Sequence, residues 1–180
     1  MRIRYSLDAT DYLKFQLFIA SRSRQVKRRR AFALWFIPVL YILVGVVIFG
    51  FDHLVAMIVF SAVAVLWAIF YPFYCRNSYV RYYRRFIEEH YSDNFNKDFF
   101  IETRDDGFYL EAEEANSNVK YSAVKNIFNL ASHYLIQLNP GTVVILPVDK
   151  TEQDQLEALI KEISDQSKKI VLDCRKWKWK

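Results

Sequence analysis

With 180 residues and a net charge of +5, the chain has room for one modest soluble domain beside any membrane segment. Residues 1–30 carry nine Lys or Arg against two Asp, whereas residues 92–180 carry twelve basic and fifteen acidic side chains. The positive charge therefore lies beside an apolar segment, where anionic lipid is the nearer partner, and nucleic-acid binding is not expected. The two cysteines, Cys75 and Cys174, are far apart, which argues against a disulfide framework.

The first thirty residues predict a cytoplasmic strand and a basic amphipathic helix. Residues 1–7 alternate weakly between polar and apolar side chains, as a short strand does. Asp8 or Thr10 is a suitable N-cap, and Asp11 would stand favourably in the first turn of a helix over 9–27. Such a helix would lie either on the inner leaflet or against the soluble domain, and the sequence leaves both open.

Residues 31–75 predict a transmembrane hairpin. The runs 31–51 and 54–75 contain no charged side chain, and only Asp52-His53 separates them. At about 1.5 Å per residue each run spans roughly 31 Å, the thickness of a bilayer core. The first run is too long for a signal peptide, so we expect retained, antiparallel helices with small residues at their contact. The alternative is a buried helical hairpin in a soluble protein.

Lysine and arginine counts predict the orientation of the hairpin. Both outer flanks are rich in Arg, while the two-residue connection has neither Lys nor Arg. The positive-inside rule then places both termini in the cytoplasm, in a multi-pass protein of the inner (cytoplasmic) membrane. The side chains predicted to meet the membrane surface are Lys27, Arg28, Arg29, Arg30, Arg76, Trp177, Lys178, Trp179 and Lys180.

The last four of these belong to a basic, Trp-containing tail over 169–180. Alternating indole and cationic side chains suit the head-group region of a membrane. The alternative is a frayed tail or an edge strand whose Trp side chains pack on the domain.

Residues 76–168 predict a juxtamembrane helix (76–96) followed by a β-rich domain (97–168). Asp106-Gly107 between the alternating runs 99–103 and 108–112 predicts a hairpin. Further strands are expected at 119–128, 134–138 and 142–146, with a turn at 139–141. Thr151 should cap a final helix with one apolar face, formed by Leu156, Leu159, Ile160 and Ile163.

This order predicts an α+β membrane protein. Its soluble part would be a small antiparallel sheet or half-barrel closed by the C-terminal helix, and parallel βαβ pairing is not expected.

At this point the chain resembles the YcxB-like family of small bacterial membrane proteins. Residues 104–108 match the acidic-Gly hairpin of the family, and residues 121–127 resemble its Trp-Ser segment, with Tyr121 in place of Trp. Residues 134–136 and 144–147 resemble its last two strands. The resemblance implies a cytoplasmic, pleckstrin-homology-like (PH-like) domain, and it implies no defined activity and no catalytic residues.

The residues themselves suggest no enzyme and no cofactor. The three histidines, His53, His90 and His133, have no metal-ligand spacing and are expected to be exposed or structural. The acidic group Asp105, Asp106, Glu111, Glu113 and Glu114 is expected to be a solvated edge.

Our first hypothesis is therefore a non-enzymatic inner-membrane protein whose PH-like domain binds a protein, peptide or lipid head group. The alternatives are a membrane-protective immunity or stress factor and an accessory subunit of a larger membrane complex. The bilayer is the expected partner, with anionic head groups, an unknown protein and a homo-oligomer as further candidates.

Overall fold

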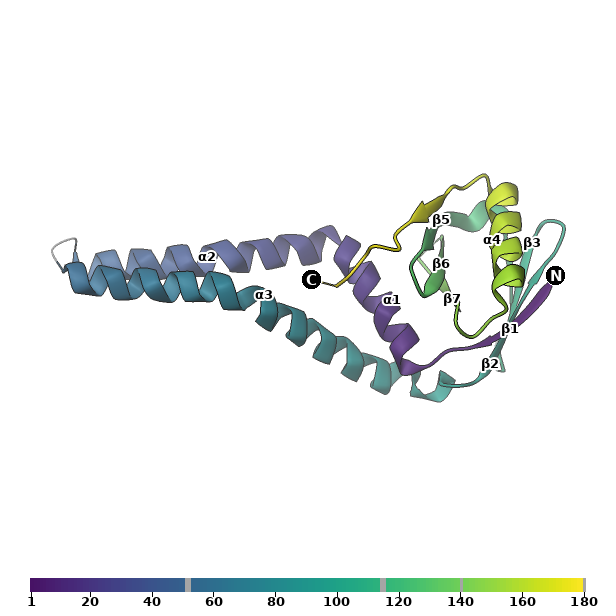
Figure 1. Cartoon of the computed structure of the whole chain (residues 1–180), viewed down its shortest axis with the longest axis horizontal. Coiled ribbons are helices and arrows are strands. Elements are labelled where there is room, and N and C mark those ends of the chain that lie inside the picture. Colours follow the sequence, from purple (N-terminus) through teal and green to yellow (C-terminus); the bar gives the residue numbers. More distant parts are fainter. Residues whose placement is uncertain (51–52, 114–115, 140, 180) are drawn as a thin grey trace. The chain divides into compact units, whose positions relative to one another are not determined.

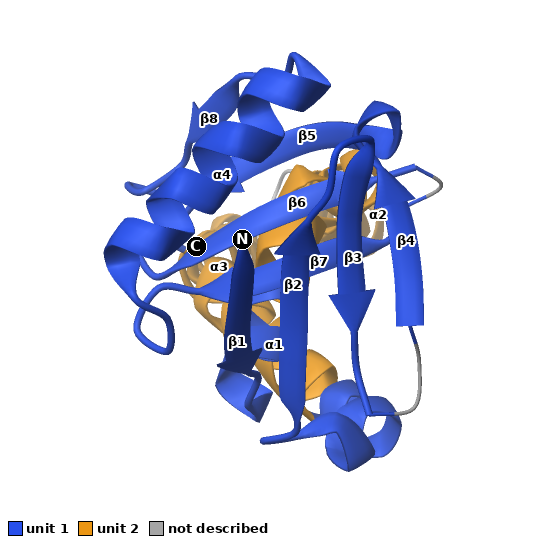
Figure 2. Ribbon diagram, turned by 90° about the vertical axis from the view of Figure 1, so that its right-hand side faces the viewer, with its two compact units in different colours: residues 1–15, 85–178 blue, residues 16–84, 179–180 orange. Residues whose placement is uncertain are grey.

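The computed structural model describes residues 1–50, 53–113, 116–139 and 141–179 (Figure 1). The fold is α+β, with four α-helices and two four-stranded sheets in the described part of the chain. It forms two compact units, one made of residues 1–15 and 85–178 and the other of residues 16–84 and 179–180 (Figure 2). The first unit is thus assembled from two separate stretches of sequence, and the apolar segment lies between them in the chain.

The helices near the N-terminus are divided at Ser23. Helix α1 spans Ala9–Arg22, and helix α2 spans Arg24–Phe49. Ser23 has extended backbone angles, and its hydroxyl accepts a hydrogen bond from the Val26 N–H as the N-cap of α2. The predicted helix over 9–27 is therefore wrong at its end, because a serine cap starts a new helix there. The basic cluster belongs to the long apolar helix.

Helix α3 spans Leu54–Tyr91 and runs beside α2 in the opposite direction (Figure 1). The expected juxtamembrane helix is thus the continuation of the second apolar run, and a short 3-10 turn, Ser92–Asn94, follows it. Gly45 of α2 and Ala64 of α3 are buried, as expected for small residues at the contact between the two helices. The Trp67 Nε1–H lies 3.4 Å from the Ala33 carbonyl. Two other small residues of α3, Ser61 and Ala62, are exposed, so the expectation of small residues at the helix contact does not hold for them.

Large apolar side chains cover the outside of these two helices. Trp35 is 72% exposed and Val47 is 82% exposed, and Gly45 is the buried residue of α2. Both helices are long and apolar enough to cross a membrane. Exposed apolar surface of this extent is typical of a site that meets a membrane or another protein.

The first sheet has the order β1-β2-β3-β4 and is antiparallel throughout. Strand β1 (Arg2–Ser6) pairs with β2 (Asp98–Thr103), so the N-terminal strand is part of the β-rich domain. Strands β2 and β3 (Gly107–Glu111) form the predicted hairpin, and β4 (Asn116–Lys120) is the edge strand opposite β1.

The second sheet has the order β7-β6-β5-β8. Its strands are β5 (Val124–Asn129), β6 (His133–Leu138), β7 (Val143–Pro147) and β8 (Val171–Asp173). Strand β8 pairs with β5 in parallel, so the expectation of no parallel pairing is wrong. The connection between β5 and β8 includes helix α4 (Gln153–Ser167), which supplies the crossover that a parallel pair needs.

Two local predictions are corrected. The single strand expected at 119–128 is two strands in different sheets, because Tyr121–Ala123 forms a 3-10 turn between β4 and β5. Tyr121 is buried there, and its hydroxyl donates to the Arg104 carbonyl at 3.0 Å. The N-cap of α4 is Glu152, since the Thr151 hydroxyl donates instead to the Pro147 carbonyl at 2.8 Å.

The apolar face of α4 is confirmed, with Leu156, Leu159, Ile160 and Ile163 all buried. The turn expected at 139–141 includes Pro140, which lies outside the described residues. Gly141 has φ +131, and its N–H donates to the Leu138 carbonyl at 2.9 Å.

Candidate functional site

A buried polar network joins the start of α1 to the second sheet. Asp11 is 3% exposed and His133 is 2% exposed, and Nε2 of His133 lies 2.8 Å from Oδ1 of Asp11. Since the carboxylate can only accept, the imidazole donates from Nε2. Nζ of Lys150 donates to Oδ2 of Asp11 at 2.6 Å and to Oδ2 of Asp8 at 2.8 Å.

The same two aspartates cap α1 reciprocally. The Asp8 carboxylate accepts from the Thr10 and Asp11 N–H groups, and the Asp11 carboxylate accepts from the Asp8 N–H at 2.9 Å. This confirms Asp8 as the N-cap. Burial alone would raise the pKa of Asp11, but the hydrogen bonds from His133 and Lys150 outweigh it and hold that pKa well below the usual range.

The order Asp11–His133–Ser132 is that of a catalytic triad, with Ser132 Oγ 2.8 Å from His133 Nδ1. Ser132 also lies 3.3 Å from Nζ of Lys14. The imidazole is 2% exposed and lies between Asp11 and Ser132, so the network ties the first turn of α1 to the start of β6. We call this network the clamp.

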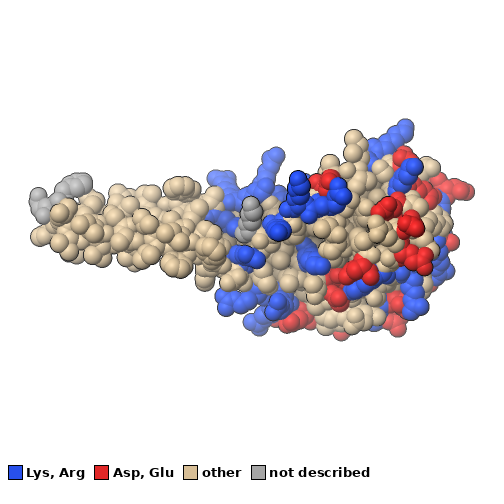
Figure 3. Space-filling view, in the orientation of Figure 1, with Lys and Arg blue, Asp and Glu red and all other residues tan. Residues whose placement is uncertain are grey.

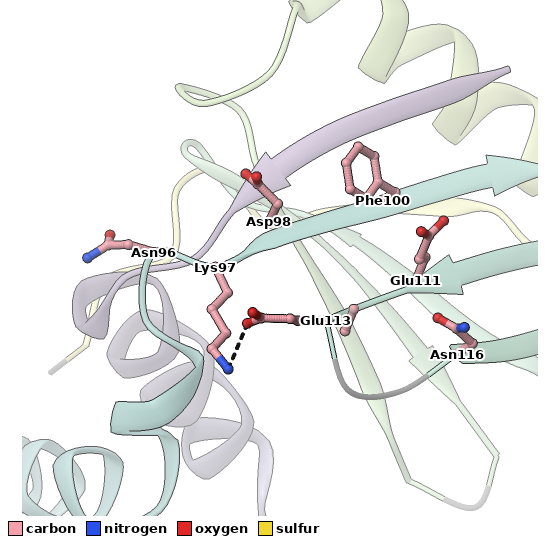
Figure 4. Close-up of a pocket in the computed structure, with 8 residues that line it drawn as sticks. Asn96, Lys97, Asp98, Phe100, Glu111, Glu113 and Asn116 are labelled. Atoms are coloured by element: carbon pink, nitrogen blue, oxygen red, sulfur yellow. Dashed lines mark ion pairs between the residues drawn. The ribbon is translucent and has the colours of Figure 1, made fainter.

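A shallow groove of about 530 Å³ lies on the first sheet. Asp98 and Phe100 of β2, Glu111 of β3 and Asn116 of β4 line it (Figure 4). Lys97 and Glu113 close one end with an ion pair of 2.8 Å, marked by the dashed line in Figure 4.

Ion pairs cross this sheet. Arg2 binds Glu111 at 2.9 Å and stacks over the Phe100 ring at 4.5 Å, and Arg4 binds Asp98. Two of the residues expected to form a solvated edge, Glu111 and Glu113, are thus paired, whereas Glu114 lies outside the described residues.

A basic collar surrounds the end of the hairpin where α2 begins. We use this name for Arg22, Arg24, Lys27, Arg28, Arg29, Arg30, Arg76, Arg81 and Arg84. Lysine and arginine gather there and leave the rest of α2 and the apolar part of α3 uncharged (Figure 3). Asp52 is the only acidic residue in the sequence between 16 and 84, and the next acidic residues of α3, Glu88 and Glu89, follow the last arginine of the collar by four and five positions.

Two grooves lie between α2 and α3 at the collar. The larger, the α2–α3 groove, measures about 430 Å³ and is lined by Gln25, Val26, Arg29, Ser78, Tyr79, Tyr82 and Tyr83. The smaller measures about 230 Å³ and is lined by Lys27, Arg30, Ala31, Leu34, Tyr71 and Pro72. Arginine and tyrosine together offer several hydrogen-bond donors to an anion.

The end of the tail lies in the collar. The Trp179 Nε1–H lies 3.4 Å from the Arg76 carbonyl, its ring meets Tyr79 edge-on at 5.7 Å, and Arg30 lies over it at 5.2 Å. Trp179 thus joins three elements that the sequence had assigned to the membrane surface.

The other predicted surface residues are spread more widely. Lys27 and Arg30 line the smaller groove, Arg29 lines the larger one, and Arg28 is exposed. Trp177 follows β8, where its N–H donates to the Cys174 carbonyl at 2.9 Å, and Lys178 is exposed. Lys180 lies outside the described residues. The alternative of an edge strand is confirmed for residues 171–173.

Sequence reasoning missed the clamp. The available signals were the Asp8-x-x-Asp11 spacing of a reciprocal cap and a histidine at the start of a mostly apolar strand. In the described part of the chain, no group of three His, Cys, Asp or Glu residues could hold a metal ion.

Residues 104–163 match the family model described as YcxB-like protein, which confirms the resemblance over this segment. No curated protein and no solved structure matches the chain. The match runs from the turn before β3 into α4. It contains His133 and Lys150, whereas their partners Asp8 and Asp11 lie outside it. The N-terminal strand and the first turn of α1 thus pack with a segment that is similar to the YcxB-like family.

Proposed function

We propose that this protein is a non-enzymatic membrane anchor that presents its YcxB-like domain at the cytoplasmic surface of the inner membrane. The observation that carries the proposal is the apolar hairpin. Each of its two apolar runs is uncharged over about one bilayer thickness, and large apolar side chains are exposed on both helices, as at Val47 of α2 and Val55 of α3. The basic collar at one end supports a cytoplasmic location for that end.

We further propose that the domain is PH-like and serves as an interaction module. Two sheets with an amphipathic C-terminal helix support this architecture. Residues 92–180 carry fifteen acidic against twelve basic side chains, so repulsion disfavours anionic lipid on the domain itself. A protein or peptide is the better partner, and the groove beside the β4 edge is a suitable surface, since an edge strand can pair with an added strand.

Membrane extraction and labelling test the anchor. The full-length chain should stay with membranes through alkaline carbonate washing and leave them only in detergent. Cysteines placed at residue 2 and after residue 180 should be shielded from an impermeant maleimide in intact cells. A chain released by carbonate, or one labelled at either terminus, would contradict the proposal.

Photo-crosslinking tests the interaction surface. A crosslinking amino acid at Asn116, which is exposed and lines the groove, should give one discrete adduct in cells. The same amino acid at the exposed Lys161 of α4 serves as control. Adducts of equal yield at both sites would argue against the groove.

A further inference from the structure

The α2–α3 groove has the lining of an anion site. It opens between the first turns of α2 and the part of α3 beyond the second apolar run, and its volume is about 430 Å³. That lies within the range of small-molecule sites, roughly 300–1,000 Å³. Arg29 supplies a guanidinium, and Tyr79, Tyr82 and Tyr83 supply hydroxyl groups.

The charge of Arg29 is not neutralised within the described residues. Arg29 is exposed, and none of the described ion pairs or hydrogen bonds involves it. Other arginines of the chain do pair, as Arg2 does with Glu111 and Arg85 with Glu89. The groove therefore presents a guanidinium that has no carboxylate partner among the described residues.

The depth of the groove matches the head-group layer. Arg29 lies two residues before the first apolar run, and Tyr82 lies seven residues beyond the second. At about 1.5 Å per residue these positions are roughly 3 Å and 10 Å outside the apolar core. The head-group layer occupies roughly the first 5–8 Å on each side of that core, so lipid phosphates lie at the level of the groove.

We propose that the α2–α3 groove binds the phosphate-bearing head group of an anionic phospholipid, with Arg29 on the phosphate and the tyrosine hydroxyls on its free oxygens. Tyrosine suits this place because its ring is apolar and its hydroxyl is wet. Basic pockets between transmembrane helices on the cytoplasmic side are a recurrent form of lipid site. The inference rests on the proposed membrane anchor and adds a site and a ligand class to it.

Native mass spectrometry of the full-length protein in detergent, titrated with phosphatidylglycerol, tests the site. Arg29→Gln should weaken retention of this lipid by at least about tenfold, since a charge-assisted bond is lost. Arg28→Gln is the matched control, because it removes the same charge from the next residue of α2, which does not line the groove. Its retention should stay within about twofold of the unchanged protein.

Three further measurements complete the test. Tyr82→Phe, which keeps the ring and the charge, should weaken retention about threefold. Phosphatidylcholine should bind at least about tenfold more weakly, because its head group has no net charge. Soluble glycerol 3-phosphate should not displace the lipid. Displacement by it would show a site for a free phosphate and would overturn the lipid assignment.

Equal losses in Arg29→Gln and Arg28→Gln would show that the collar attracts lipid through its total charge, and would overturn the proposal. Unchanged retention in Arg29→Gln would overturn it as well. Both outcomes differ from failure of the membrane anchor, in which the unchanged protein would leave membranes in carbonate.

Discussion

Nε2 of His133 lies 2.8 Å from Oδ1 of Asp11, although 122 positions separate the two residues in the chain. The contact ties the first turn of α1 to the start of β6, across the whole inserted hairpin. A second contact supports it nearby, where the Tyr12 and Tyr91 rings stack at 4.7 Å. The chain therefore leaves the domain and returns to it at a fixed place, and the domain can fold as one unit despite its divided sequence.

Asp11→Asn should destabilise the protein by about 3 kcal/mol, because it leaves the buried His133 without its anion and Lys150 with Asp8 alone. Thermal unfolding of the full-length chain in detergent would measure this. Asp154→Asn is the control, since Asp154 is exposed in the first turn of α4. It should change stability by less than about 0.5 kcal/mol. Equal effects of the two substitutions would contradict the clamp.

The clamp also predicts a loss of stability in acid. The folded state holds the pKa of Asp11 and of Asp8 below the ordinary value of about 3.9, despite the opposing effect of burial, because His133 and Lys150 bind Asp11 and Lys150 also binds Asp8. Below about pH 4 the unfolded chain takes up more protons than the folded chain, so stability falls as pH falls toward the lowered pKa. Denaturation curves between pH 2 and pH 7 should show a shallower acid loss in Asp11→Asn. An unchanged slope would refute this.

Local sequence signals predicted those helices and strands that a local property of the chain determines, such as apolar length, turn residues or apolar spacing. The uncharged runs specify α2 and α3, Asp106-Gly107 specifies the β2–β3 hairpin, and the spacing of Leu156, Leu159 and Ile163 specifies the buried face of α4.

Local sequence signals did not predict the structure where a contact between residues far apart in the chain determines it. The strand over 119–128 reads as continuous, but the turn at Tyr121 depends on a hydrogen bond to Arg104, which no local pattern reveals. The clamp was not predicted for the same reason, since the partner of His133 is Asp11 in the first turn of α1. Parallel pairing of β8 depends on how α4 returns the chain, which composition does not encode.

Gly107→Ala should destabilise the domain by about 2 kcal/mol or more, as overpacking does. A Cβ at this position would lie 2.2 Å from the Val119 carbonyl oxygen, which belongs to the backbone of β4 and can move only if the strand moves. Urea denaturation followed by circular dichroism would measure the loss. Ser117→Ala, at an exposed position of β4, is the control and should change stability little. A stable Gly107→Ala protein would show that β4 does not pack as described.

Gly45→Leu should separate the two apolar helices, because even a Cβ at Gly45 would lie 2.9 Å from Cγ of Phe60. Crosslinking of cysteines at Ala33 and Trp67 would measure the separation and leaves Phe60 in place, since the Trp67 Nε1–H lies 3.4 Å from the Ala33 carbonyl. The yield should fall severalfold in Gly45→Leu. Val47→Leu is the matched control, because Val47 is 82% exposed on the same helix and a larger apolar side chain there meets no neighbour. Equal yields in both variants would contradict the helix contact.

Trp179→Ala should release the C-terminal tail from the basic collar. The substitution removes the hydrogen bond to the Arg76 carbonyl, the edge contact with Tyr79 and the cation–π contact with Arg30. Each such contact contributes about 0.5–1 kcal/mol, so the tail should become several times more accessible. Limited trypsin digestion after Lys176 and Lys178, followed by mass spectrometry, would measure the rate of cleavage.

Tyr79→Ala should accelerate this cleavage too, because it removes one of the three partners of Trp179. Tyr82→Ala is its control, since Tyr82 stands three residues further along α3 and stacks edge-on against Tyr83 at 5.2 Å. If Tyr82→Ala accelerated cleavage as much as Tyr79→Ala, general loosening of α3 would account for the effect, and the tail contact would be refuted. A selective effect of Tyr79→Ala would locate the end of the chain at the collar, beside the groove assigned to lipid.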